Sequence, residues 1–145
     1  MPSTNWKNLN NMQLGRYAEM YATMEFLSYG ADVYPSEVDD HGVDLIVKSK
    51  AGTYHEIQVK SVYKSKYVFV KNEYIDDNTR DYQVCLILFE DGKNPKMYLL
   101  PAEVWRNATS KLFVDRPYEY GINISKKNAD ELEQYTFEKM ISKII

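Results

Sequence analysis

The sequence has one cysteine, Cys85, among its 145 residues. A single cysteine cannot form an intramolecular disulfide, and Cys85 lies inside the apolar run VCLILF, which predicts a core residue in a reducing compartment. No apolar run is long enough to cross a bilayer, and the N-terminal segment MPSTNWKNLNN lacks the apolar core of a signal peptide. We therefore expect a cytoplasmic protein that has no contact with membranes.

An excess of positive charge is also absent. The formal net charge is −3 and the sequence pI is about 5.4, which excludes a protein that coats nucleic acid through its overall field. The charges are unevenly distributed, however. Lysines are frequent between positions 48 and 71, where Glu56 is the only acid, and acids predominate in the next twenty positions. A local basic face is therefore compatible with an acidic protein.

The remaining composition is that of a folded globular chain, with 44% hydrophobic and 27% charged residues. A chain of this length can bury a sizeable core without disulfides or a structural metal. It contains no internal repeat, low-complexity tract or linker-like segment. We therefore expect a single domain over residues 1–145.

Periodicity predicts a mixed α/β (α+β) fold. Apolar residues at helical spacing indicate a helix over residues 11–29 that Gly30 ends. The segment 72–82 is polar and is expected to be a loop. The strands are expected at 31–35, 43–47, 53–63, 67–71, 84–89 and 96–100, followed by a short helix at 101–106, one short strand within 112–124 and a C-terminal helix at 125–145.

The segment 42–60 carries the most informative polar residues. Asp44 opens one predicted strand, and Gln58 and Lys60 share one face of the next strand, because successive side chains alternate. If the two strands form a hairpin, Asp44 lies near Gln58 and Lys60. Glu19 has Gly15 and other small or apolar neighbours at helical spacing, so it either faces inward or is an ordinary exposed acid.

These residue types suit metal-assisted cleavage of phosphodiesters. A hard cation such as Mg²⁺ prefers oxygen ligands and keeps several waters, so one or two carboxylates suffice when a substrate phosphate supplies further oxygens. Asp44 would anchor the metal, with the Gln58 amide oxygen, the Val59 carbonyl oxygen and Glu19 as further donors. Lys60 would orient the attacking water or neutralise charge on the phosphate.

Glu19 in LGRYAEMYA, Asp44 in GVDLIV and the Gln58-Val59-Lys60 triplet in EIQVKS together resemble the PD-(D/E)XK nuclease superfamily. The resemblance implies a restriction-endonuclease-like core, in which a mixed central sheet is flanked by helices in the order helix, three strands, helix, strand, plus a C-terminal helix. It also implies a Mg²⁺- or Mn²⁺-dependent endonuclease with Asp44, Gln58, Lys60 and Glu19 as its catalytic residues. Asp44, Gln58 and Glu19 would be its metal ligands.

The resemblance further implies that the partner is nucleic acid, DNA more than RNA, and that the protein is a homodimer. The exposed lysines of the basic segment are the expected contacts to the phosphate backbone. These are Lys48, Lys64 and Lys66.

One departure from the superfamily pattern is chemically important. Gln58 occupies a position where an acid is usual, which removes a negative charge from the metal site. Metal affinity would then depend on Asp44, Glu19 and Asp40, and Glu56, about 6 to 7 Å along the strand, could substitute for the missing acid. The alternative reading is a nuclease-like fold that has lost catalysis and serves as a nucleic-acid-binding or protein-interaction module. The glutamine and the acidic net charge favour that alternative, whereas Asp44, Lys60 and Glu19 favour the enzyme.

Overall fold

The computed structural model describes residues 1–37, 41–108 and 110–145 and contains two β-sheets. The larger sheet has five strands in the order β1-β2-β3-β5-β6. Its β3 and β5 are parallel and its other neighbours are antiparallel, so the expected mixed central sheet is confirmed. The strands are β1 (Asp32–Pro35), β2 (Leu45–Lys48), β3 (Tyr54–Tyr63), β5 (Tyr82–Phe89) and β6 (Lys96–Pro101).

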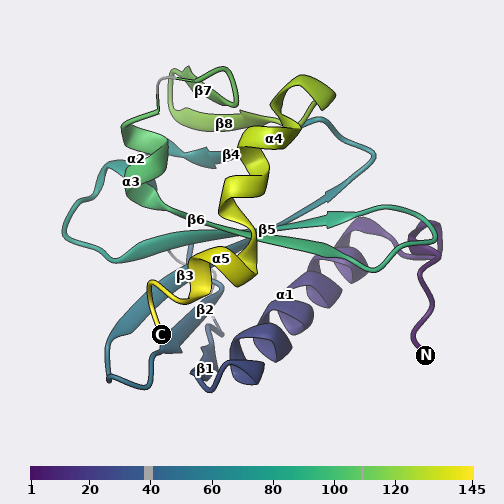
Figure 1. Cartoon of the computed structure of the whole chain (residues 1–145), viewed down its shortest axis with the longest axis horizontal. Helices are drawn as coiled ribbons and strands as arrows, with labels where there is room; N and C mark the ends of the chain where they lie inside the picture. The colour runs from purple at the N-terminus through teal and green to yellow at the C-terminus, as the bar shows by residue number, and fades with distance from the viewer. Residues whose placement is uncertain (38–40, 109) are drawn as a thin grey trace.

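Helix α1 (Asn11–Ser28) covers one face of this sheet, as Figure 1 shows. Its buried residues recur every four positions, which gives the helix one apolar stripe; they are Leu14, Ala18, Ala22 and Phe26. A capping box joins Asn10 and Gln13 at its start. The stripe packs against a layer that includes Ile57 and the fully buried Cys85. Burial raises the pKa of the Cys85 thiol.

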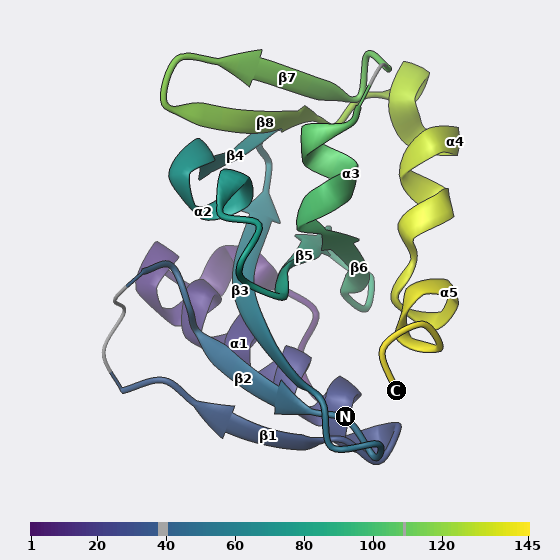
Figure 2. The same ribbon diagram turned by 90° about the vertical axis from the view of Figure 1, so that its left-hand side faces the viewer.

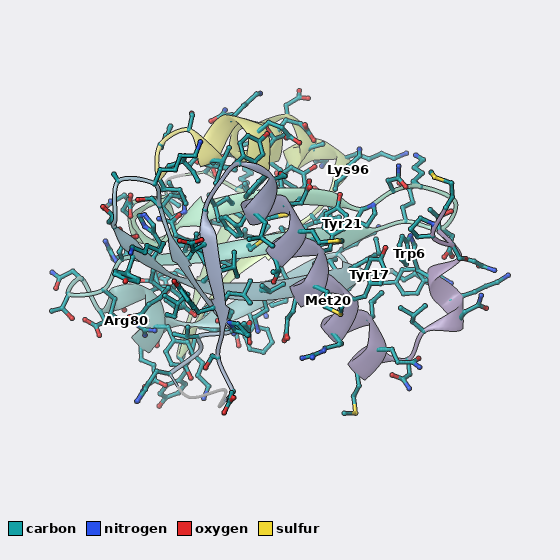
Figure 3. All side chains as sticks on the ribbon, turned by 90° about the horizontal axis from the view of Figure 1, so that it is seen from below. Trp6, Tyr17, Met20, Tyr21, Arg80 and Lys96 are labelled. Carbon is teal, nitrogen blue, oxygen red and sulfur yellow. The ribbon has the colours of Figure 1, made fainter. Side chains whose placement is uncertain are left out.

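The N-terminal segment is attached to the same side of the molecule through η1 (Trp6–Asn8). The Trp6 indole Nε1 donates to the carbonyl oxygen of Glu90 at 3.0 Å, and its ring meets Tyr17 and Phe89 edge to face. Figure 3 shows Trp6 and Tyr17 close together beside α1. This contact ties the chain before α1 to the end of β5.

A second layer lies on the opposite face of the five-stranded sheet (Figures 1 and 2). It is a three-stranded antiparallel sheet in the order β4-β8-β7, with two short helices beside it. Its members are β4 (Tyr67–Lys71), β7 (Phe113–Arg116), β8 (Glu119–Asn123), α2 (Asn72–Asp76) and α3 (Ala102–Arg106). Val70, Trp105 and Ile122 join residues of β5 and β6 in a second hydrophobic core.

Two local predictions were wrong in detail. The expected loop 72–82 contains α2, which buries Ile75 completely, and the stretch 112–124 forms two strands instead of one. The strand predicted at 67–71 is confirmed as β4, but it belongs to the smaller sheet. Val68 and Val70 are buried there while Phe69 between them is exposed, so β4 packs through one face only.

The prediction of a continuous C-terminal helix was also wrong. The segment forms η2 (Lys126–Asn128), α4 (Ala129–Leu132), η3 (Glu133–Tyr135) and α5 (Phe137–Ile141). The break is at Thr136, whose backbone is extended and forms a β-bridge with Tyr98. The break lets Phe137 pack against Phe26, with ring centroids 5.0 Å apart. None of the described helices is long and apolar enough to span a membrane.

Candidate functional site

The candidate site lies where β3 extends beyond β2. Strand β2 pairs with β3 only from Tyr54 to Ile57, whereas β5 pairs with β3 as far as Tyr63. In the described part of the chain, the β2-side edge of β3 therefore has no strand partner after Ile57. Backbone N–H and C=O groups on such an edge require other partners.

Asp44 supplies one of these partners. It directly precedes β2, and its backbone N–H donates to the carbonyl oxygen of Ile57 at 2.9 Å. Its carboxylate Oδ2 then accepts a hydrogen bond from the backbone N–H of Val59 at 2.7 Å. The side chain thus continues the hydrogen-bond ladder at the point where the two strands separate. The β2–β3 register, extended by one residue, places Asp44 opposite Gln58, as the hairpin prediction required.

Gln58 meets the buried end of Tyr82, the first residue of β5. The Tyr82 hydroxyl oxygen lies 2.5 Å from Gln58 Oε1 and 2.7 Å from the carbonyl oxygen of Gly42. A tyrosine hydroxyl has one proton, so it can donate to only one of these acceptors. Burial raises the pKa of Tyr82, which keeps the hydroxyl protonated. Sequence reasoning missed this tyrosine, because only the parallel β3–β5 pairing brings it to Gln58.

Gly42 is required by this arrangement. Its φ is +71°, and a Cβ on it would lie 2.5 Å from the Tyr74 ring and 2.9 Å from the Tyr82 hydroxyl. A larger residue would push the segment before Asp44 away from β5. Gly42 therefore helps to position Asp44.

Lys60 lies on the same face of β3 as Gln58, two residues further along the strand. Its Nζ is 5.5 Å from the centre of the Phe69 ring on β4, within the range of a cation–π contact. The ammonium group is thus directed towards the smaller sheet. Lys60 connects the candidate site with that sheet.

Glu56, the proposed substitute for a missing acid, is paired with another residue. Arg80 Nε and Nη2 donate to Glu56 Oε2 at 2.8 and 2.5 Å, and Nη2 also donates to the His41 carbonyl oxygen at 2.9 Å. The Arg80 side chain is only 13% exposed. This carboxylate neutralises a largely buried cation, so it is poorly suited to bind a metal. No sequence pattern indicates this pair, because it also depends on the parallel pairing of β3 with β5.

Glu19 lies at the rim of the molecule, with its side chain 37% exposed and one oxygen 3.9 Å from Arg16 Nη1. Its helix covers the sheet face to which Ile57 and Val59 contribute. Gln58 and Lys60 alternate with those residues and point to the other face. A role for Glu19 at Asp44 remains a prediction. Asp40 lies outside the described residues.

The three predicted DNA-contacting lysines do not form one patch. Lys48 pairs with Tyr54 at the start of β3, whereas Lys64 and Lys66 follow the end of that strand. At roughly 3.3 Å per residue, the two ends of this ten-residue strand are about 30 Å apart. Lys64 Nζ also lies 4.0 Å from a carboxylate oxygen of Asp91. Lys64 and Lys66 are therefore neighbours, whereas Lys48 lies at the other end of β3.

The oxygen donors around Asp44 are of the type that a hard cation prefers. Across residues 1–37, 41–108 and 110–145, no group of three or more His, Cys, Asp or Glu side chains is arranged to hold a metal ion. A donor set with one fixed carboxylate and neutral oxygens nevertheless fits a Mg²⁺ or Mn²⁺ ion that is bound weakly and shares a substrate phosphate.

The sequence matches no protein-family model and resembles no curated protein closely enough to identify a relative. Its fold resembles solved structures that include two nucleases. Hjc, a Holliday junction resolvase from Archaeoglobus fulgidus, is 14% identical with a TM-score of 0.55; the match covers 75% of this chain and 83% of the resolvase. The bacterial homing endonuclease I-Ssp6803I is 20% identical with a TM-score of 0.50, over 81% of this chain and 78% of that one. The chain therefore has a resolvase- and endonuclease-like fold.

Proposed function

We propose that this chain is a metal-dependent nuclease of the PD-(D/E)XK superfamily that hydrolyses phosphodiester bonds in DNA. The observation that carries the proposal is the Asp44 carboxylate, held by the Val59 N–H between Gln58 and Lys60 on the unpaired edge of β3. The fold shared with a resolvase and a homing endonuclease supports it.

In this proposal Asp44 is the principal metal ligand, assisted by Gln58 and Glu19. The Val59 carbonyl is a further candidate donor, because the N–H and C=O of one strand residue point to the same side. A bound Mg²⁺ or Mn²⁺ ion would activate water and stabilise negative charge on the phosphate. The Lys60 ammonium would orient the attacking water or neutralise charge that develops on the phosphate.

The orientation of the Gln58 amide bears directly on this role. If Tyr82 donates to the Gly42 carbonyl, which can only accept, then Gln58 satisfies the same hydroxyl by donating from Nε2. Rotating the Gln58 amide by half a turn places Nε2 next to the Tyr82 hydroxyl. The positions of Oε1 and Nε2 are assigned only from the hydrogen bonds that they make. The rotation releases Oε1 from Tyr82 and makes it available as a metal ligand.

We also propose which lysines contact DNA and that the chain forms a homodimer. Lys64 and Lys66 would contact the DNA backbone together, and Lys48 would contact it separately. A homodimer would supply a second copy of the site for the opposite strand.

A second candidate function is a nucleic-acid-binding module without catalysis. It is favoured by the single fixed carboxylate and by the engagement of Gln58 with Tyr82. Such a module would bind DNA with the same affinity whether or not a divalent metal is present.

The deciding experiment incubates the chain with branched, single-stranded and duplex DNA in Mg²⁺ or Mn²⁺. Asp44→Asn and Lys60→Met test the site, with Asp32→Asn and Lys127→Met as matched controls at exposed positions away from it. Cleavage that only the first pair abolishes supports the nuclease. Binding without cleavage on every substrate supports the second candidate. Cleavage that is unchanged in all variants shows that the site is wrong.

A further inference from the structure

The outward face of β4 carries two aromatic rings next to the candidate site. Tyr67 and Phe69 alternate with the buried Val68 and Val70, so their rings share the outer face of the smaller sheet. The ring centres are 6.3 Å apart and the planes differ by 24°. Phe69 is 46% exposed, so its ring is accessible to a ligand. We call this pair the aromatic platform.

The platform is held rigidly by its neighbour on β8. A Cβ on Gly121 would lie 2.2 to 2.4 Å from atoms of the Tyr67 ring, so this ring rests directly on the glycine backbone. The Tyr67 hydroxyl donates to a carboxylate oxygen of Glu119 at 2.5 Å. Its orientation is therefore fixed before any ligand arrives, which reduces the entropy that binding would cost.

Two cationic groups lie over the rings of the platform. The Arg116 guanidinium carbon is 4.6 Å from the Tyr67 ring centre, and Lys60 Nζ is 5.5 Å from the Phe69 ring centre. Lys71 continues the same face of β4, opposite Glu119. The only acid at the facing β8 positions is Glu119, which already accepts the Tyr67 hydrogen bond. A base that stacks on either ring would displace the cation above it, and the displaced cation could then contact the adjoining phosphate.

We propose that the aromatic platform stacks the bases of a single-stranded nucleic acid segment, with Lys60 and Arg116 beside its phosphates. Because Lys60 belongs to both surfaces, a strand on the platform leads directly to Asp44. The proposed nuclease would then act on DNA that has an unpaired segment beside the cleaved bond. This last step rests on the proposed function, but the binding of single strands does not. In duplex DNA the bases are stacked on one another, so they cannot stack on the aromatic platform.

The test measures binding in EDTA, by fluorescence anisotropy, of a labelled single-stranded oligonucleotide and of a blunt-ended duplex that contains the same strand. Phe69→Ala should weaken single-strand binding about tenfold, while duplex binding changes less than about twofold. Phe69→Tyr should restore single-strand binding. Tyr34→Ala, at an exposed aromatic residue on β1, is the matched control and should have no effect.

Each outcome distinguishes this proposal from the nuclease proposal. Loss of single-strand binding in Phe69→Ala, with rescue by Phe69→Tyr, supports the platform even if no DNA is ever cleaved. Single-strand binding that is unchanged in Phe69→Ala overturns the platform, even if cleavage that depends on Asp44 is observed. An equal loss for duplex, or no single-strand binding by the native chain, also overturns it.

Discussion

The polar face of β3 has two parts whose side chains have different kinds of partner: the Glu56 end and the Gln58 end. Glu56 and Gln58 are two residues apart on one face, yet Glu56 pairs with the largely buried Arg80 whereas Gln58 contacts the neutral Tyr82 hydroxyl. At the Gln58 end, a backbone N–H orients the Asp44 carboxylate. The first end has the features of a stabilising ion pair. The second holds an amide and a carboxylate in fixed positions, as a site for an external ligand requires.

The comparison predicts that Asp44→Asn affects chemistry far more than stability. The amide oxygen can still accept from the Val59 N–H, but the negative charge is lost. We expect the cleavage rate to fall by at least about 100-fold, while the free energy of unfolding in urea changes by less than about 1 kcal/mol. A loss of stability without a loss of cleavage would show that Asp44 is only structural.

Glu56→Gln should have the opposite effect. The amide cannot neutralise Arg80, whose side chain is mostly buried, so we expect the free energy of unfolding to fall by about 1 to 3 kcal/mol. Cleavage by the folded variant should be unchanged. Urea denaturation measures the first effect, with Glu37→Gln as an exposed control. A fall in cleavage at full stability would place Glu56 in the site.

Tyr82→Phe removes the hydroxyl between Gly42 and Gln58 and should cost about 1 to 2 kcal/mol at pH 7. Burial raises the pKa of Tyr82 above that of an unfolded tyrosine, which is about 10. The associated stability is complete below pH 10 and is lost as the pH rises towards the folded-state pKa. The native chain should therefore lose stability above pH 10 more steeply than Tyr82→Phe. Equal slopes in urea denaturation at pH 9 to 11 would contradict this assignment, and Tyr34→Phe provides the exposed control.

Gln58→Glu should make the second end a stronger metal site. An added carboxylate beside Asp44 is expected to raise the affinity for Mn²⁺ about tenfold, as measured by calorimetry. The gain should disappear in the double variant with Asp44→Asn. An affinity that is unchanged in Gln58→Glu would show that this side chain does not reach the metal.

Local patterns were sufficient to predict helix α1 and strands β3 and β4. The apolar stripe of α1 and the alternation in β3 and β4 are properties of neighbouring residues, so their bounds were predicted closely. The proximity of Asp44 and Gln58 followed from the hairpin, because an antiparallel register is short-range information.

Long-range pairing determined the features that the sequence did not predict. Arg80 reaches Glu56, and Tyr82 reaches Gln58, only through the parallel β3–β5 pairing. The C-terminal helix breaks because Thr136 pairs with Tyr98, a contact that helical periodicity cannot anticipate. The position of Asp44 beside Gln58 was therefore predictable, whereas the protein environment of these two side chains was not.

Because Cys85 is buried, its reaction with a thiol reagent reports when the hydrophobic core opens. The only thiol in the sequence is 0% exposed, and burial raises its pKa, so the reactive thiolate is suppressed in the folded protein. A thiol reagent should modify Cys85 only when β5 separates from α1, and the modification rate then measures how often this happens. In a Phe69→Cys variant the new thiol would be exposed, so a thiol reagent would label it and leave the buried Cys85 unmodified.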